Sequence, residues 1–185
     1  MAAFYLTALA VLLSGFAARD QMTVAALTQA QGQRFGVLIT GLLCSAIACA
    51  ITAYVATMFL AILAPPARPI LAAIAIGLAG LESLFISTRL KVKEPTHSLG
   101  ALGFVLMARQ LTDATRFIVF GLAVGMGAPL AAGLGGGLAS FALIAGAWAF
   151  APLFSLRALP IVRRVVGGLL LVTGIGLYVS NQGLL

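Results

Sequence analysis

Long apolar runs dominate this sequence and decide what it can fold into. Six of them are long enough to cross a membrane as helices, because a bilayer core of about 30 Å takes roughly 20 helical residues. They cover about residues 3–30, 35–63, 69–88, 99–126, 129–154 and 160–181. Only 8% of the 185 residues are charged, too few to cover the surface of a soluble enzyme or a secreted domain. The sequence therefore predicts an all-α, polytopic membrane protein with six transmembrane helices.

Basic residues fall mainly on one side of these spans. Seven of them lie in or beside the loops that follow spans one, three and five: Arg34, Arg89, Lys91, Lys93, Arg157, Arg163 and Arg164. The loops on the other side carry Arg68 alone. By the positive-inside rule the seven are cytoplasmic, which places loop 89–98 inside and both termini outside. We therefore attribute the net charge of +7 to topology rather than to nucleic-acid binding, and we expect a multi-pass protein of a plasma membrane or bacterial inner membrane.

The two halves of the chain are similar when one is shifted by 93 residues. This shift places Asp20 on Asp113 and segment 84–87 on segment 177–180. We predict a first repeat at 1–88, a basic linker at 89–98 and a second repeat at 99–185. Three spans per repeat is an odd number, so the repeats would enter the membrane from opposite sides, as in many transporters with a site near the midplane. Chance similarity between two apolar stretches is the alternative interpretation.

Motifs for enzyme catalysis are missing from the sequence. The single histidine, His97, lies in a polar loop, and Cys44 and Cys49 lie inside one apolar run, where we expect them to pack as thiols. The glycine cluster at 133–137 lacks the preceding strand and following lysine of a phosphate loop, so we interpret it as a close helix contact. We predict no enzyme activity and no bound cofactor other than a transported divalent cation.

Two spans carry polar residues near their middle, at 19–23 in the first and at 109–116 in the fourth. Charges at that depth cost at least about 2.5–3.5 kcal/mol each on insertion scales, so they mark function or tight pairing. On a continuous helix, Arg109, Asp113 and Arg116 share one face, and Asp113 is expected to pair with these arginines. Asp20 points away from its neighbour Arg19 and is freer to face span four.

The pattern around the two aspartates resembles the Golgi-type manganese/calcium cation–proton exchangers of the lysine-exporter superfamily. These small six-helix proteins carry a Glu-x-Gly-Asp-(Lys/Arg)-(Thr/Ser) motif in the first helix of each of two inverted halves. Laid on that motif, residues 17–22 and 110–115 match at Asp20, Asp113 and Thr115. Ala17 and Gln110 replace the two glutamates, and the glycine and basic positions also differ. The resemblance implies exchange of a divalent cation for protons.

The polar centre has two main interpretations. It is either a transport site, whose carboxylates bind a cation or take a proton when the cation leaves, or a closed ion-pair network. The transport site would comprise Asp20, Asp113, Gln110, Thr112, Thr115, Gln21 and Glu82. In the closed network, the three acids would neutralise Arg19, Arg109 and Arg116. Direct binding of an anionic substrate by the arginines is a third alternative.

We therefore expect an integral membrane secondary transporter that exchanges a divalent cation of the manganese or calcium type for protons by alternating access. The alternative is a non-transporting membrane subunit that keeps the exchanger fold and packs in a larger membrane complex. The expected partners are the lipid bilayer, protons and a small cation, with a second copy of the chain or a larger complex as a further option. No nucleic acid is expected.

Overall fold

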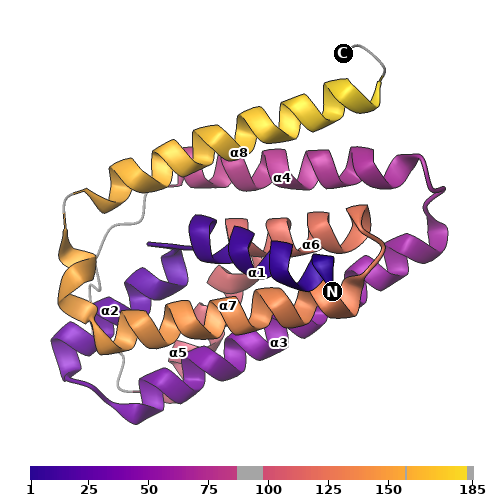
Figure 1. The fold of residues 1–185 in the computed structure, drawn as a ribbon. Helices are drawn as coiled ribbons and strands as arrows, with labels where there is room; N and C mark the ends of the chain where they lie inside the picture. The colour runs from indigo at the N-terminus through magenta and orange to yellow at the C-terminus, as the bar shows by residue number, and fades with distance from the viewer. Residues whose placement is uncertain (87–97, 157, 183–185) are drawn as a thin grey trace.

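The computed structural model describes residues 1–86, 98–156 and 158–182 of the chain. These residues form helices and no strand (Figure 1), which confirms the all-α prediction for this part of the chain. The elements are α1 (Ala2–Ser14), α2 (Arg19–Gln31), α3 (Phe35–Ile62), α4 (Ala67–Phe85), α5 (Leu99–Leu111), α6 (Ala114–Gly125), α7 (Pro129–Ala149), the 3-10 helix η1 (Ala151–Ser155) and α8 (Leu159–Asn181). The predicted linker 89–98, except Ser98, and Arg157 lie outside the described residues.

Within the described residues, four helices are long and apolar enough to cross a membrane: α3, α4, α7 and α8. The pair α1 and α2 makes a fifth candidate span if it is counted as one, although the two helices are bent by 55°. Helices α5 and α6 are apolar but shorter. The described part of the chain is thus all-helical, with the four to five candidate spans of a membrane-embedded protein. The predicted continuous helices at 3–30 and 99–126 are wrong, because each is broken near its middle.

The break in the first run lies between α1 and α2. Ala17 adopts φ 62°, in the left-handed region that an L-residue other than glycine adopts at a cost, and so ends the regular helix. The side chain of Gln21 holds the loop. Its Oε1 accepts a hydrogen bond from the Ala17 backbone N–H at 3.1 Å, and its Nε2 donates to the Gly15 carbonyl. Two backbone groups freed by the break are thereby satisfied inside the protein, as a membrane interior requires.

The break in the fourth run lies at Thr112 and Asp113, where α6 begins. The Asp113 carboxylate accepts from the Thr115 backbone N–H at 3.2 Å and from the Thr115 hydroxyl at 2.8 Å. Aspartate is among the preferred residues at a helix N-cap, because its oxygen satisfies an N–H that has no partner within the helix. Arg109 and Arg116 therefore sit on two separate helices, and the face predicted to join them with Asp113 does not exist.

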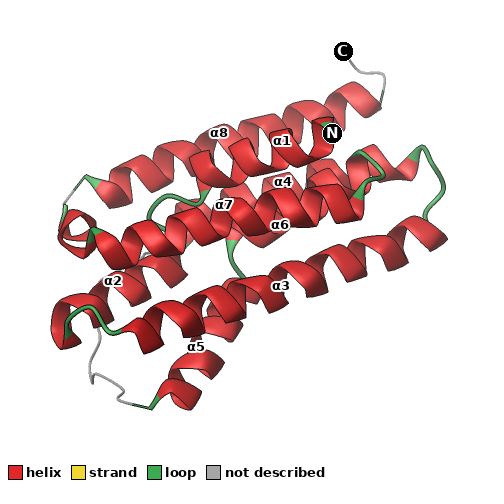
Figure 2. Cartoon of the chain, turned by 60° about the horizontal axis from the view of Figure 1, so that its bottom comes forward, coloured by secondary structure: helices red, strands yellow, loops and turns green. Residues whose placement is uncertain are grey.

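Helices α4 and α8 lie side by side along one face of the bundle (Figures 1 and 2). Their backbones approach closely: a Cβ added at Gly80 would lie 2.5 Å from the Leu171 backbone N, and one at Gly174 would lie 2.7 Å from the Gly77 backbone N. Close packing of this kind drives helix association in lipid, where no water is displaced. The predicted helix contact of cluster 133–137 is confirmed at Gly133, where a Cβ would lie 2.8 Å from that of Ala53.

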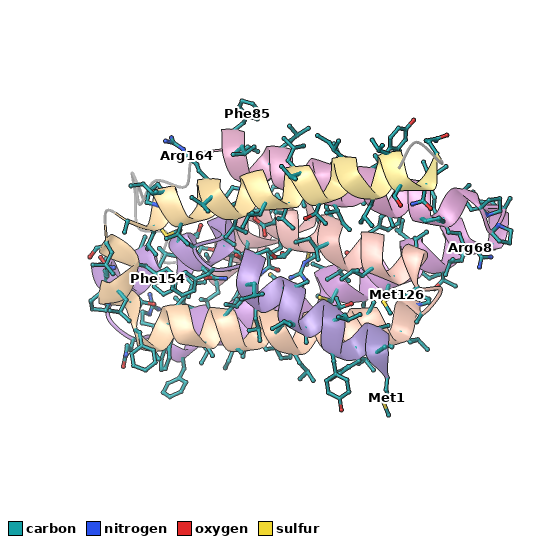
Figure 3. The ribbon with its side chains drawn as sticks, turned by 45° about the horizontal axis from the view of Figure 1, so that its top comes forward. Met1, Arg68, Phe85, Met126, Phe154 and Arg164 are labelled. Carbon is teal, nitrogen blue, oxygen red and sulfur yellow. The ribbon has the colours of Figure 1, made fainter. Side chains whose placement is uncertain are left out.

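The centre of the bundle is α6, which contacts α1, α3, α4 and α7. This position buries the start of α6 in the interior. Many large apolar side chains instead point outward, among them Leu134, Leu169 and Val172, as expected for a surface in lipid. Figure 3 shows Arg164, Phe85 and Phe154 toward one end of the bundle and Arg68, Met126 and Met1 toward the other.

Candidate transport site and ion-pair network

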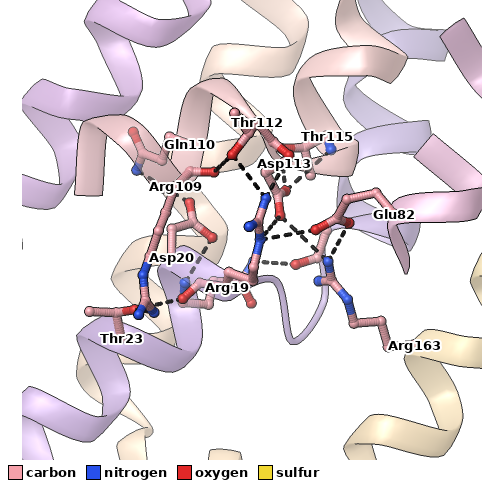
Figure 4. A network of polar contacts seen from close by, with 12 residues as sticks. Arg19, Asp20, Thr23, Glu82, Arg109, Gln110, Thr112, Asp113, Thr115 and Arg163 are labelled. Atoms are coloured by element: carbon pink, nitrogen blue, oxygen red, sulfur yellow. Dashed lines mark hydrogen bonds and ion pairs between the residues drawn. The ribbon is translucent and has the colours of Figure 1, made fainter. Parts of the chain in front are cut away.

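Polar side chains meet where the two broken runs come together in the interior (Figure 4). All three acids there are buried, with Asp20 at 5%, Glu82 at 7% and Asp113 at 1% of their full exposure. Also buried are Gln21, Gln110, Thr115, Arg116 and Arg163, whereas Arg19 is half-buried and Arg109 and Thr112 are exposed. The structure therefore brings most of the predicted site residues together and places Thr112 and Arg109 at the edge.

Asp20, in the first turn of α2, is held by neutral donors. Its Oδ1 accepts from the Gln21 backbone N–H at 2.7 Å, and its Oδ2 accepts from Gln110 Nε2 at 3.2 Å. Among the described residues no basic nitrogen lies within 4.0 Å of this carboxylate. Asp113 and Arg116 are near enough to interact with it electrostatically. Asp20 thus faces the other broken run, as the sequence indicated, and its partner there is an amide.

Gln110 is fully buried at the end of α5 and links the two broken runs. Besides its bond to Asp20, Nε2 donates to the Gly41 carbonyl of α3 at 3.5 Å. Its Oε1 is buried and has no hydrogen-bond partner. Buried polar atoms are rarely left in this state, so such an oxygen calls for an explanation. The amide nitrogen of Gln110 thus faces the Asp20 carboxylate and the Gly41 carbonyl, and its oxygen is the atom left without a partner.

Glu82 and Asp113 are engaged with arginines from two other helices. Arg163 Nη2, on α8, lies 2.6 Å from Glu82 Oε2 and 3.5 Å from Asp113 Oδ1. Arg19 Nε, on α2, lies 2.9 Å from Glu82 Oε1 and 3.9 Å from Asp113 Oδ1. Two acids and two arginines therefore form a compact network that ties α2, α4, α6 and α8 together.

Arg163 is the member of this network that the sequence interpretation missed. The distribution of basic residues assigns it to the loop charges, but it lies inside α8 and its side chain is only 2% exposed. A signal was present: residues 163, 167 and 174 are spaced so that they share one helix face, and Gly167 and Gly174 pack that face on α4. Its neighbour Arg164 lies off this face and is exposed.

Arg109 and Arg116, both predicted to neutralise acids, instead bind neutral groups. Arg109 Nη1 donates to the Thr23 hydroxyl at 2.5 Å. Arg116 Nη1 donates to Cys49 Sγ at 2.6 Å and to the Ser140 hydroxyl at 3.2 Å, and its Nη2 donates to the Ser45 hydroxyl at 3.1 Å. In the described part of the chain neither arginine forms an ion pair within 4.0 Å. The predicted closed network therefore keeps Arg19 but exchanges these two arginines for Arg163.

The remaining predicted ligands have structural partners already. Arg19 Nη2 donates to the Thr112 carbonyl at 2.6 Å and to the Thr112 hydroxyl at 3.1 Å. Thr115 donates to the N-cap carboxylate, and Gln21 holds the first break. Across residues 1–86, 98–156 and 158–182, no three His, Cys, Asp or Glu side chains come together as a metal-binding group. Asp20 is thus the predicted carboxylate ligand that neutral donors alone hold within the described residues.

Comparison with known proteins gives no match of any kind: no family model, no curated protein and no solved structure is significantly similar to this chain. The assignment of a function therefore depends on the residues and the geometry described above.

Proposed function

We propose that the chain is a secondary transporter that exchanges a small cation for protons, with Asp20 as the ion-coupling residue. One observation carries this proposal. Asp20 is a buried carboxylate between the two broken runs that, among the described residues, has no arginine within 4.0 Å. An acid at such depth that is not committed to a basic partner marks an ion or proton pathway.

The oxygens near Asp20 suit a hard cation. The Asp20 carboxylate and the Gly41 carbonyl both face the Gln110 side-chain amide, and both are oxygen ligands of the kind that calcium, magnesium and manganese ions take. Turning the Gln110 amide over would direct its unpartnered Oε1 toward them as a third ligand. A single carboxylate neutralises only half the charge of a divalent ion. Binding of the manganese or calcium type would therefore draw Asp113 or Glu82 away from its arginines, and loss of the ion would return the acid to them.

An inverted-repeat architecture with alternating access forms part of this proposal. Arg19 and Thr112, which the 93-residue shift superposes, contact each other, as residues on a two-fold axis would. Helix α1 packs on α6 and α2 packs on α5, in line with that axis. The α4–α6 contact is extensive, whereas the equivalent contact between α2 and α8 is at most slight among the described residues. We propose six spans, each broken run counting as one, with both termini outside and residues 89–98 in the cytoplasm.

A non-transporting membrane subunit is the second candidate. The observation in its favour is the network of Glu82, Asp113, Arg19 and Arg163, because four paired charges in the interior hold helices together without any ion. In this case the chain would pack against its own copy or a larger membrane complex, and Asp20 would serve only to bind Gln110.

Flux measurements on matched aspartate variants separate the two candidates. The protein is reconstituted in proteoliposomes, and uptake of manganese and calcium is measured with and without a pH gradient. Asp20→Asn keeps the size of the side chain and one acceptor oxygen for the Gln21 N–H, and its new amide N–H can donate to Gln110 Oε1 once the Gln110 amide turns over. We expect this variant to fold normally and to abolish uptake. Asp113→Asn is the comparison at the equivalent position of the second half, and we expect it to differ from Asp20→Asn by lowering thermal stability, because it weakens two ion pairs.

Each outcome has a definite meaning. Wild-type uptake that needs the pH gradient, together with a folded and inactive Asp20→Asn protein, supports the exchanger. Wild-type protein that moves neither ion supports the subunit. A folded Asp20→Asn protein with unchanged uptake would remove Asp20 from the mechanism.

A further inference from the structure

Arg116 is a buried charge without a close counter-charge. Arg116 is only 3% exposed. Among the described residues, its guanidinium donates hydrogen bonds to the Ser45 and Ser140 hydroxyls and to the Cys49 thiol. Its Nε is buried and has no hydrogen-bond partner. A guanidinium stays protonated in proteins, so this positive charge is permanent. Asp20 lies more than 4.0 Å from the Arg116 guanidinium and interacts with it electrostatically.

A cavity of about 290 Å³ reaches Arg116 from the outer surface of the bundle. It lies between α3, α4 and α6, and its lining is apolar apart from Arg116 and Thr52. The apolar lining residues are Ile51, Val55, Leu71, Ile74, Ala75, Leu78, Leu111, Phe117 and Phe120. Several of these, including Ile51, Ile74 and Leu78, are at least 41% exposed, so the cavity opens on the lipid-facing side. A ligand would enter it from the membrane.

We infer that this cavity binds a lipophilic monocarboxylate, with the carboxylate at Arg116 and the apolar body along α3, α4 and α6. The inference is independent of transport and holds for either candidate function. Charge complementarity selects the ligand class: Arg116 lines an otherwise apolar cavity and has no acid within 4.0 Å among the described residues, and a carboxylate matches its charge and can accept two parallel hydrogen bonds from a guanidinium. The volume is near the lower limit for ligand sites, which suits an acid of medium chain length.

A second cavity on the same bundle provides an internal control. It also measures about 290 Å³ and lies between α3 and α7, lined by Ala46, Cys49, Ala50, Ala53, Leu130, Gly133, Leu134, Gly137, Leu138 and Phe141. No charged side chain lines it. Acyl chains or an apolar ligand could enter both cavities alike, but a carboxylate gains a counter-charge only in the first.

Binding of radiolabelled decanoate to the purified protein in detergent tests the inference, with methyl decanoate as the uncharged analogue. We expect saturable binding of one decanoate per chain and at least tenfold weaker binding of the ester, since a hydrogen bond to a charged group contributes about 1.5–3 kcal/mol. Arg116→Gln removes the charge and should weaken decanoate binding at least tenfold.

Two further variants keep the test decisive if Arg116→Gln does not fold. Leu78→Trp fills the first cavity from its exposed side, and we expect it to weaken decanoate binding as strongly. Ala50→Trp fills the second cavity in the same way, and we expect no change. Equal binding of decanoate and its ester, an equal loss in Ala50→Trp and Leu78→Trp, or no saturable binding at all would overturn the inference. The last result would mean that Asp20 alone neutralises Arg116.

Discussion

Replacing Arg163 by glutamine tests whether the network between α4 and α8 stabilises the fold. The side chain of Arg163 is 2% exposed, and its Nη2 lies 2.6 Å from Glu82 and 3.5 Å from Asp113. Its Nη1 also donates to the Ala17 carbonyl at 3.2 Å, at the first helix break. The change removes all these contacts and leaves two buried acids with one arginine, Arg19.

The expected loss of stability follows from that count. Removing one partner of a buried ion pair costs about 3–5 kcal/mol, and the lower end applies because Arg19 remains 2.9 Å from Glu82. For a chain of this size, about 1 kcal/mol corresponds to a change of about 2–4 °C in Tm, which gives a fall of about 6–12 °C. Arg164→Gln is the matched control, since Arg164 is adjacent in sequence but exposed. Its expected effect is within about 0.5 kcal/mol.

The measurement is thermal unfolding of the purified variants in one detergent, followed by intrinsic fluorescence. A double variant, Arg163→Gln with Glu82→Gln, completes a double-mutant cycle, and we expect its loss to be smaller than the sum of the two single losses. Equal Tm shifts for Arg163→Gln and Arg164→Gln would refute the reasoning, because both arginines would then behave as surface charges.

Two further predictions concern packing and topology. Gly80→Ala should lower Tm, because its Cβ would lie 2.5 Å from the Leu171 backbone N and overpacking costs about 1–3 kcal/mol. Gly77→Ala, one turn earlier with no atom within 4 Å of the new Cβ, should leave Tm unchanged or raise it, and equal responses would contradict the α4–α8 contact. In intact cells, a membrane-impermeant maleimide should label Gln182→Cys but not Gln33→Cys, because the basic excess predicts that only residue 182 faces outward. The reverse pattern would invert the orientation.

The extent of the helices follows closely from the distribution of apolar residues. The predicted span 35–63 is α3 (Phe35–Ile62), and the predicted span 160–181 is α8 (Leu159–Asn181). Proline explains part of this agreement, because Pro65–Pro66 prevents α3 from continuing and Pro160 stands at the first turn of α8, where no hydrogen bond is lost.

The helix breaks were harder to predict, because hydropathy hardly changes across them. Residues 15–18 are glycine, phenylalanine and two alanines, a composition that any apolar helix could contain. Their turn is stabilised by Gln21, whose side chain reaches back to Gly15 and Ala17. The second break had a local cue, since aspartate before a run of helix-forming residues is a common N-cap. The four- and three-residue spacings of Arg109, Asp113 and Arg116 instead favour one continuous helix.

Ion pairing in this protein joins residues that are remote in sequence, and this limits what local spacing can reveal. The i, i+4 and i, i+3 spacings pair Asp113 with Arg109 and Arg116, whereas its partners are Arg19 and Arg163, from helices at opposite ends of the chain. Glu82 takes the same two arginines. Once these four charges are matched, the buried charges without a close opposite charge in the described part of the chain are Asp20 and Arg116. The proposed cation exchange at Asp20 and the proposed carboxylate binding at Arg116 both follow from these two charges. In a membrane interior, an unmatched charge is costly unless a ligand balances it.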